Sequence, residues 1–155
     1  MKVLGGMVWP EDGNNGFLCI VTDKSEAPDK TLEKPREYIE ILREYSDQNI
    51  FNIFKEIKET KRLTGVYAPN DMKYRSFIYE YSRWRRENNC GVLLKAPQVS
   101  SFEAGVLKIK DYTLKKTIIF PENSIIRAQL MVFSKLSIKN QSDFAAVNSL
   151  VQVIN

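Results

Sequence analysis

The stretch GVYAPNDMKYRSFIYEYSRWRRENNCGVLL, residues 65–94, decides the fold class of this chain. It opens with a short apolar run at 65–68 and closes with another at 91–94. Each run is too short for a helix, so we expect two buried strands. Between them, apolar and aromatic residues recur at helical spacing from Tyr74 to Trp84, which predicts a helix with one buried face. A strand, a helix and a second strand in succession indicate an α/β domain.

Upstream of this unit, the chain begins with two apolar, β-rich runs at 2–9 and 17–22. The segment between them is dense in Gly, Asn, Asp and Pro, so the two runs predict a β-hairpin. The polar residues 23–34 predict a loop. The chain therefore opens with antiparallel strands.

Two helices are expected next. Pro35 suits the first turn of a helix, and helical spacing follows at four residues before Ser46 and Asp47, namely Tyr38, Ile41, Leu42 and Tyr45. A second helix is predicted over 50–57, where Ile50, Ile53, Phe54 and Ile57 form an apolar stripe opposite charged residues.

Downstream of residue 94, helices are expected to begin at Ser100 or Ser101, at Asn123 or Ser124, and at Asp143, with an extended piece at 117–120. Asp71 is the expected N-cap of the helix that carries Trp84. The whole order predicts a mixed central β-sheet flanked by helices.

The length of 155 residues predicts one domain, residues 1–155. Only two cysteines are present, which excludes a disulfide framework and favours a reducing compartment. No apolar run approaches the roughly 20 residues that a membrane span needs, and the N-terminus lacks a signal-peptide pattern. We therefore expect a soluble cytoplasmic protein with no membrane partner.

The chain contains no histidine. This excludes Ser-His-Asp and Cys-His nucleophile pairs and His-ligated zinc. The sequence also lacks the Gly-rich phosphate loops and the nucleophile elbow of serine hydrolases. Any catalysis must rest on carboxylates, lysines, tyrosines or a hard metal such as Mg²⁺ held by oxygen ligands.

Basic residues alternate with aromatic ones in the helix predicted after Asp71. They are Lys73, Arg75, Arg83, Arg85 and Arg86. Arginines beside aromatic rings can bind phosphates and stack on bases, so this group is the candidate DNA-binding surface. The same spacing also fits a core stripe with a solvated charged face opposite. The net charge of +4 is compatible with either interpretation.

Six acidic residues are candidate metal ligands: Glu11, Asp12, Asp23, Asp71, Glu103 and Asp143. Metal-dependent nucleases need acids that converge from different strands and helices, so that Mg²⁺ or Mn²⁺ can bridge the attacking and leaving oxygens. These acids show no signature spacing, and each also fits a cap or a turn.

Three stretches carry a resemblance to a known family. GVYAPNDMKYRSFIYEYSR (65–83), SSFEAGVLKIKDYTLKKTIIFPENSIIRAQLMVFSK (100–135) and SDFAAVNSLVQVI (142–154) resemble successive segments of the nuclease domain of phage large terminases. The resemblance implies a ribonuclease H-like fold, with catalytic acids after the first strand, at the end of the strand at 66–68, and in the closing helix.

This sequence departs from the family pattern at each of those places. Trp9 stands where the first acid is expected, Asp71 is displaced from the second, and Asn148 follows Asp143 where a further acid is expected. Loss of the first acid removes a ligand shared by both metals. Glu11 or Asp12 is the candidate substitute from the adjacent turn.

The resemblance implies a nuclease-like domain that binds double-stranded DNA, works with other phage packaging proteins in the host cytoplasm and has degraded catalytic acids. If it cuts, the reaction is phosphodiester hydrolysis with Mg²⁺ or Mn²⁺, with Asp143 and Asp71 as metal ligands and Asp12 or Glu11 completing the catalytic set. The alternative is a protein-interaction module on the same fold with no nucleic-acid role.

Overall fold

The computed structural model describes residues 2–25, 37–115, 117–132 and 144–154. Its centre is a six-stranded mixed sheet with the strand order β5-β4-β1-β2-β3-β6. The strands are β1 (Val3–Val8), β2 (Gly16–Ser25), β3 (Glu37–Asp47), β4 (Leu63–Tyr67), β5 (Leu93–Lys95) and β6 (Ile118–Ile119).

Strands β1 to β3 form an antiparallel meander, β4 and β5 continue the sheet parallel to β1, and β6 adds to its far edge parallel to β3. This confirms the predicted hairpin and the mixed sheet.

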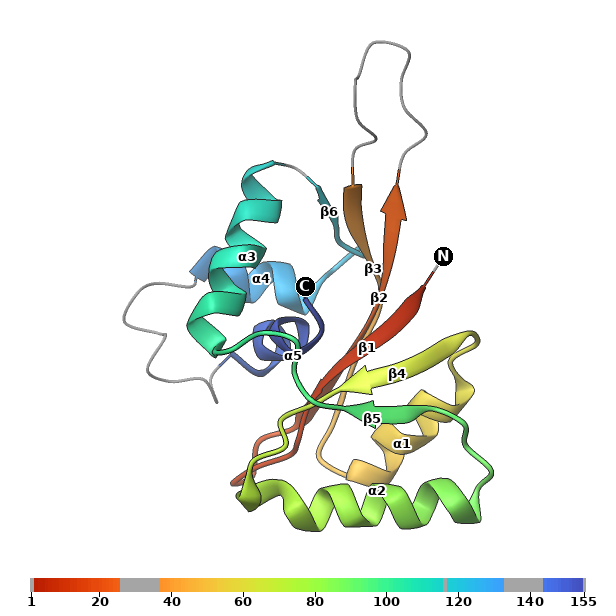
Figure 1. Cartoon of the computed structure of the whole chain (residues 1–155). Helices are drawn as coiled ribbons and strands as arrows, with labels where there is room; N and C mark the ends of the chain where they lie inside the picture. Colours follow the sequence, from red (N-terminus) through yellow and green to blue (C-terminus); the bar gives the residue numbers. More distant parts are fainter. Residues whose placement is uncertain (1, 26–36, 116, 133–143, 155) are drawn as a thin grey trace.

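Helices cover both faces of the sheet (Figure 1). One face carries α1 (Ile50–Glu59) and α2 (Arg75–Glu87), the latter preceded by a 3₁₀ turn at Met72–Tyr74. The other face carries α3 (Phe102–Leu114), α4 (Ile125–Val132) and α5 (Ala145–Val153). The predicted α/β class is therefore confirmed.

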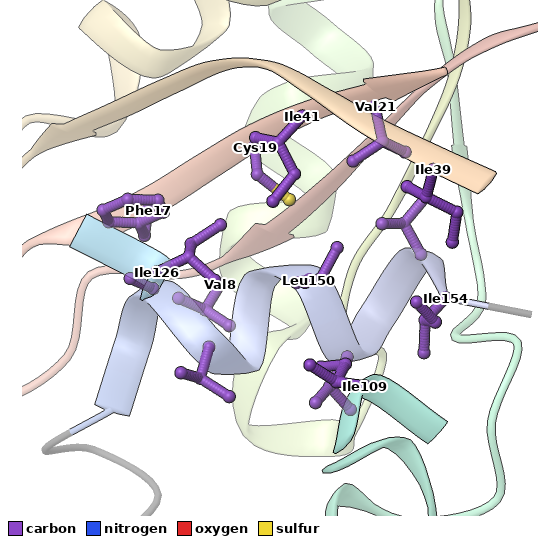
Figure 2. Packing of buried hydrophobic residues seen from close by; sticks show 14 of the residues in the cluster. Val8, Phe17, Cys19, Val21, Ile39, Ile41, Ile109, Ile126, Leu150 and Ile154 are labelled. Atoms are coloured by element: carbon purple, nitrogen blue, oxygen red, sulfur yellow. The ribbon is translucent and has the colours of Figure 1, made fainter. Parts of the chain in front are cut away.

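The alternation of side chains along β1 explains why there are two cores. Val3, Met7 and Trp9 point to the α1–α2 face, while Leu4 and Val8 point to the α5 face. Figure 2 shows the core on the α5 face, where residues of β1, β2 and β3 meet Leu150 and Ile154 at α5. Because β1 is buried on both faces, its sequence is an unbroken apolar run rather than an alternation of apolar and polar residues.

The predicted helix after Pro35 is wrong, because residues 37–47 form β3, paired with β2 along its length. A register shift explains the misleading spacing. Val21 pairs with Ile41 and the preceding Ile20 pairs with Arg43, so Leu42 is an extra, bulged residue. Ile39 and Ile41 face α5, whereas Tyr45, beyond the bulge, packs on the α1–α2 side. The bulge breaks the period of two, and the remaining pattern resembles a helix.

Local helix signals are confirmed at several ends. Ser101 rather than Ser100 caps α3, since its hydroxyl accepts from the Ala104 N–H at 3.1 Å. Ser124 rather than Asn123 caps α4, where its Oγ accepts from the Arg127 N–H at 3.1 Å. Asp71 occupies the predicted N-cap position, before the 3₁₀ turn that leads into α2, and its main-chain carbonyl oxygen accepts from the Tyr74 N–H at 2.9 Å. Its side chain makes no capping hydrogen bond. The helix start predicted at Asp143 lies outside the described residues.

The second strand of the 65–94 unit is less buried than predicted. β5 is the edge of the sheet, and both Leu93 and Lys95 are exposed. An apolar run alone does not distinguish a central strand from an edge strand, because the difference lies in whether another strand pairs beyond it.

Glu44 of β3 joins the sheet to α4. Its Oε1 accepts hydrogen bonds from the Ile126 N–H at 2.7 Å and from Ser124 Oγ at 3.1 Å, so it satisfies a free donor at the helix N-terminus. We expect Glu44→Ala to lower the free energy of unfolding by about 1–2 kcal/mol in urea denaturation. Glu44→Gln retains an acceptor and should lose less. A change from Glu44→Ala no larger than the roughly 0.5 kcal/mol of ordinary surface substitutions would contradict this role.

Candidate functional site

Because β1 and β4 are parallel neighbours, their C-terminal ends lie side by side. Trp9 follows β1, and its indole Nε1 donates to the Pro69 carbonyl oxygen, just beyond β4, at 2.9 Å. The indole also stacks on Phe77 of α2, with ring centroids 5.4 Å apart and planes within 3°. Only 4% of Trp9 is exposed. This residue therefore closes the junction of the two strand ends.

Glu11 lies beside this junction and is already paired. Its carboxylate accepts from Tyr74 Oη at 3.0 Å and forms an ion pair with Lys73 Nζ at 3.3 Å. The pKa of Lys73 is raised, chiefly by hydrogen bonding of its ammonium to the side chain of Tyr74 and then to that of Glu11. The hollow here is small, about 40 Å³, and is lined by Trp9, Glu11, Tyr74 and Asn148 among others. The carboxylate at the strand ends is thus held by a cation and a phenol.

Asp71 lines a neighbouring hollow of about 220 Å³ at the start of α3. Its other polar walls include Ser101, Asn148 and Gln152, and Gln152 Nε2 donates to Asn148 Oδ1 at 2.8 Å. Asn148 borders both hollows, and both lie beside Pro69. Amides and hydroxyls, rather than several acids, therefore line this side of the junction.

The remaining acids of the predicted catalytic set do not join this group. Asp12 is exposed in the β1–β2 turn, has a left-handed backbone with φ of 48°, and lines neither of the two hollows. Asp143 lies outside the described residues, so its predicted catalytic and metal-binding roles stay predictions. Within the described ranges, no three side chains of Asp, Glu, Cys or His gather closely enough to hold a metal ion. The described acids therefore do not fit a two-metal site.

The two cysteines also offer no nucleophile. Cys19 and Cys90 are both buried and free. Burial raises the pKa of the Cys19 thiol to about 12. A thiol that stays protonated is a weak nucleophile.

The structure separates the five basic residues that the sequence groups together. Lys73 is paired with Glu11, and Arg83 with Glu80 at 3.1 Å and Glu87 at 4.0 Å. Arg85 lies on the side of α2 that faces β5, where it lines a hollow. The charges of Lys73 and Arg83 are thus neutralised, and Arg85 faces the hollow beside β5.

Arg75 and Arg86 differ from the other three, because both are exposed and neither has an ion pair within the described part of the chain. Eleven positions separate them on α2, which brings them to the same side of the helix about 16 Å apart along its axis. Tyr79, which is 61% exposed, lies on the same stripe. These three residues form what we term the arginine stripe.

Comparison with known proteins gives a structural match without a sequence match. Neither a known protein family nor a curated protein matches the sequence. A solved structure, the large terminase from a thermophilic bacteriophage, superposes with a TM-score of 0.59 at 11% sequence identity. The match covers 99% of this chain and 39% of the terminase chain, so this chain spans well under half the length of that protein. The fold is ribonuclease H-like.

The terminase-like fold confirms the resemblance seen in the sequence. In this ribonuclease H-like chain, the paired ends of β1 and β4 are where that resemblance places catalytic acids. Trp9 and Pro69 occupy these ends. Among the described helices, none has the length and apolarity of a membrane span.

Sequence reasoning noted Trp9 as a departure but missed its bond to Pro69 and its stacking on Phe77. The two contacts join residues 60 positions apart and 68 positions apart, so no local pattern announces them. The Asn148–Gln152 pair was also missed, although its i,i+4 spacing on a predicted helix was a usable signal.

Proposed function

We propose that this chain is a DNA-binding domain of the terminase nuclease type that does not cleave DNA. The observation that carries the proposal is the buried Trp9, bonded to Pro69 at the junction of β1 and β4. A metal-dependent nuclease needs carboxylates there, in a space open to a phosphate. The buried indole of Trp9 fills this space, and the nearby carboxylate of Glu11 is already paired with Lys73.

The arginine stripe supports the DNA-binding half of the proposal. Arg75 and Arg86 present guanidinium groups without an ion pair among the described residues on one side of α2, and Tyr79 lies between them. Arginine binds phosphate in a bidentate manner, and contacts of this kind position a protein on the duplex without reading its sequence. We infer double-stranded DNA as the ligand and proteins of phage packaging as the setting.

Cleavage is tested with linear and supercoiled DNA in the presence of Mn²⁺ or Mg²⁺, beside an EDTA control. We expect no cutting above the EDTA background at high protein concentration. Metal-dependent cutting that Asp143→Ala removes would overturn the proposal, because it would mean that a carboxylate site assembles around a residue outside the described ranges.

Binding is tested by fluorescence anisotropy with a DNA duplex, titrated from about 50 to about 200 mM salt. Each phosphate contact contributes about 0.9 to the slope of log affinity against log salt concentration, so the double variant Arg75→Gln/Arg86→Gln should reduce the slope by about 1.8. Arg83→Gln is the matched control on the same helix and should change the slope little, since Glu80 and Glu87 already neutralise Arg83. No DNA binding even at low salt would instead favour the protein-interaction module.

A further inference from the structure

A hollow of about 310 Å³ lies between α2 and the edge strand β5. It borders the strand-end junction at Pro69, and none of the three residues of the arginine stripe lines it. Its apolar lining includes Ile78 and Tyr81 of α2 and Leu94 of β5. Its positive charge comes from Arg85, since the ammonium of Lys95, which also borders the hollow, is directed over the Tyr67 ring at 5.6 Å from its centroid. No carboxylate of the described residues lines the hollow. The hollow therefore combines apolar side chains with the positive charge of Arg85.

Among the described residues that line this hollow, Arg85 has a buried donor without a hydrogen-bond partner. Its Nε is buried and has no hydrogen-bond partner among the described residues, and the guanidinium forms no ion pair with any of them. The hydroxyl of Tyr81, in the same lining, is directed instead to the Val92 carbonyl oxygen, to which it donates at 2.7 Å. A buried donor without a partner is costly, and an anionic group entering the hollow would satisfy it.

The backbone of β5 provides the second half of the site. β5 pairs with β4 on one side and is the last strand of the sheet, so no strand of the described chain pairs with its outer side. Leu93 on this edge is 48% exposed. An extended peptide can pair with such an edge through its main chain while alternate side chains enter adjacent hollows.

We propose that the groove between α2 and β5 binds an extended acidic peptide segment of a partner protein. The segment pairs with the free edge of β5 and places one aliphatic side chain over Ile78 and Leu94. The residue two positions along, on the same face of the strand, sets its carboxylate against Arg85. The charge complementarity rests on the Arg85 guanidinium, whose Nε has no partner, and on the absence of acids among the described residues of the lining.

A nucleotide fits this groove less well. The volume lies at the lower limit of small-molecule pockets, which suits one or two side chains. The aromatic residue in the lining, Tyr81, is 1% exposed and its ring already contacts Phe54 and Trp84, so it offers no free face for stacking a base.

The test uses a blocked six-residue synthetic peptide with valine at positions 2 and 6, glutamate at position 4 and threonine elsewhere, so that valine and glutamate share one face of the extended chain. It is titrated into the ¹⁵N-labelled chain at low salt. We expect the amide resonances of Ser82, Leu94 and Lys95 to shift together. A counterpart with lysine in place of glutamate should not shift them. Two further peptides are N-methylated at alternate residues in opposite registers, and one of the two should lose binding because edge pairing uses every second amide.

Arg85→Gln should weaken the binding of the glutamate peptide about tenfold, whereas Arg86→Gln, the next residue on the same helix, should leave it unchanged because Arg86 does not line the hollow. Arg85→Lys retains the charge and guards against a fold defect in Arg85→Gln. Equal binding by both N-methylated peptides, or equal affinity in Arg85→Gln and wild type, would overturn the proposal. A deoxynucleoside monophosphate that shifts the same resonances when the peptide does not would overturn it in favour of a nucleotide site.

Discussion

Gly6→Ala should lower the free energy of unfolding by more than about 3 kcal/mol, at or beyond the upper end of the usual range for overpacking. A β-carbon at Gly6 would overlap the main-chain carbonyl oxygen of Ser149 and would lie 2.9 Å from Val153 Cγ1. Ser149 is fully buried in α5. A backbone carbonyl cannot rotate away as a side chain can, so α5 would have to move off β1 as a unit.

Urea denaturation followed by circular dichroism measures this effect, with Gly91→Ala as the matched control. A β-carbon at Gly91 would meet nothing within 4 Å, and we expect a change within about 0.5 kcal/mol. If Gly6→Ala unfolds as wild type does, the close approach of α5 to β1 would be wrong.

Trp9→Ala should lower the free energy of unfolding by about 3–5 kcal/mol, the usual range for deleting a large buried ring. The change removes the stacking on Phe77 and the hydrogen bond to Pro69 together. It also opens the junction of β1 and β4, so the amide resonances of Ala68 and Asn70, on either side of Pro69, should shift.

Trp9→Phe separates the two contributions. A phenyl ring retains a stacking partner for Phe77 but has no N–H for Pro69, so this variant should lose about 1 kcal/mol from the missing hydrogen bond plus a smaller amount from the lost volume. Equal stability of Trp9→Ala and Trp9→Phe would mean that the stacked ring contributes nothing, in conflict with its burial.

The two predictions bear on function as well as stability. Gly6 lies within β1 and Trp9 directly follows it, and the two residues face opposite sides of the sheet. Gly6 sets how closely α5 approaches β1, and Trp9 joins the end of β1 to the end of β4. Under the proposed function, both contacts hold together the fold that binds DNA, and Trp9 stands where the family resemblance expects the first acid.

The amino-acid sequence by itself determined the features that depend on neighbours along the chain. The opening hairpin, α1 and α2 follow from turn residues and from the spacing of apolar side chains. Ser101 and Ser124 mark the starts of α3 and α4 because a cap bonds within three residues. The alternation of strands and helices was enough for the α/β class. The stretches at 65–83, 100–135 and 142–154 carried the resemblance that the terminase comparison confirmed.

Only the tertiary structure decided the features that depend on residues far apart. The strand β3 replaced an expected helix because pairing with β2 and a bulge at Leu42 outweigh local spacing. The expected basic cluster divided because Glu11, Glu80 and Glu87 neutralise two of its members and the turn of α2 separates the rest. Trp9 became the closure of the strand ends only because β1 and β4 lie side by side, and parallel pairing between distant segments leaves no periodic mark in the sequence.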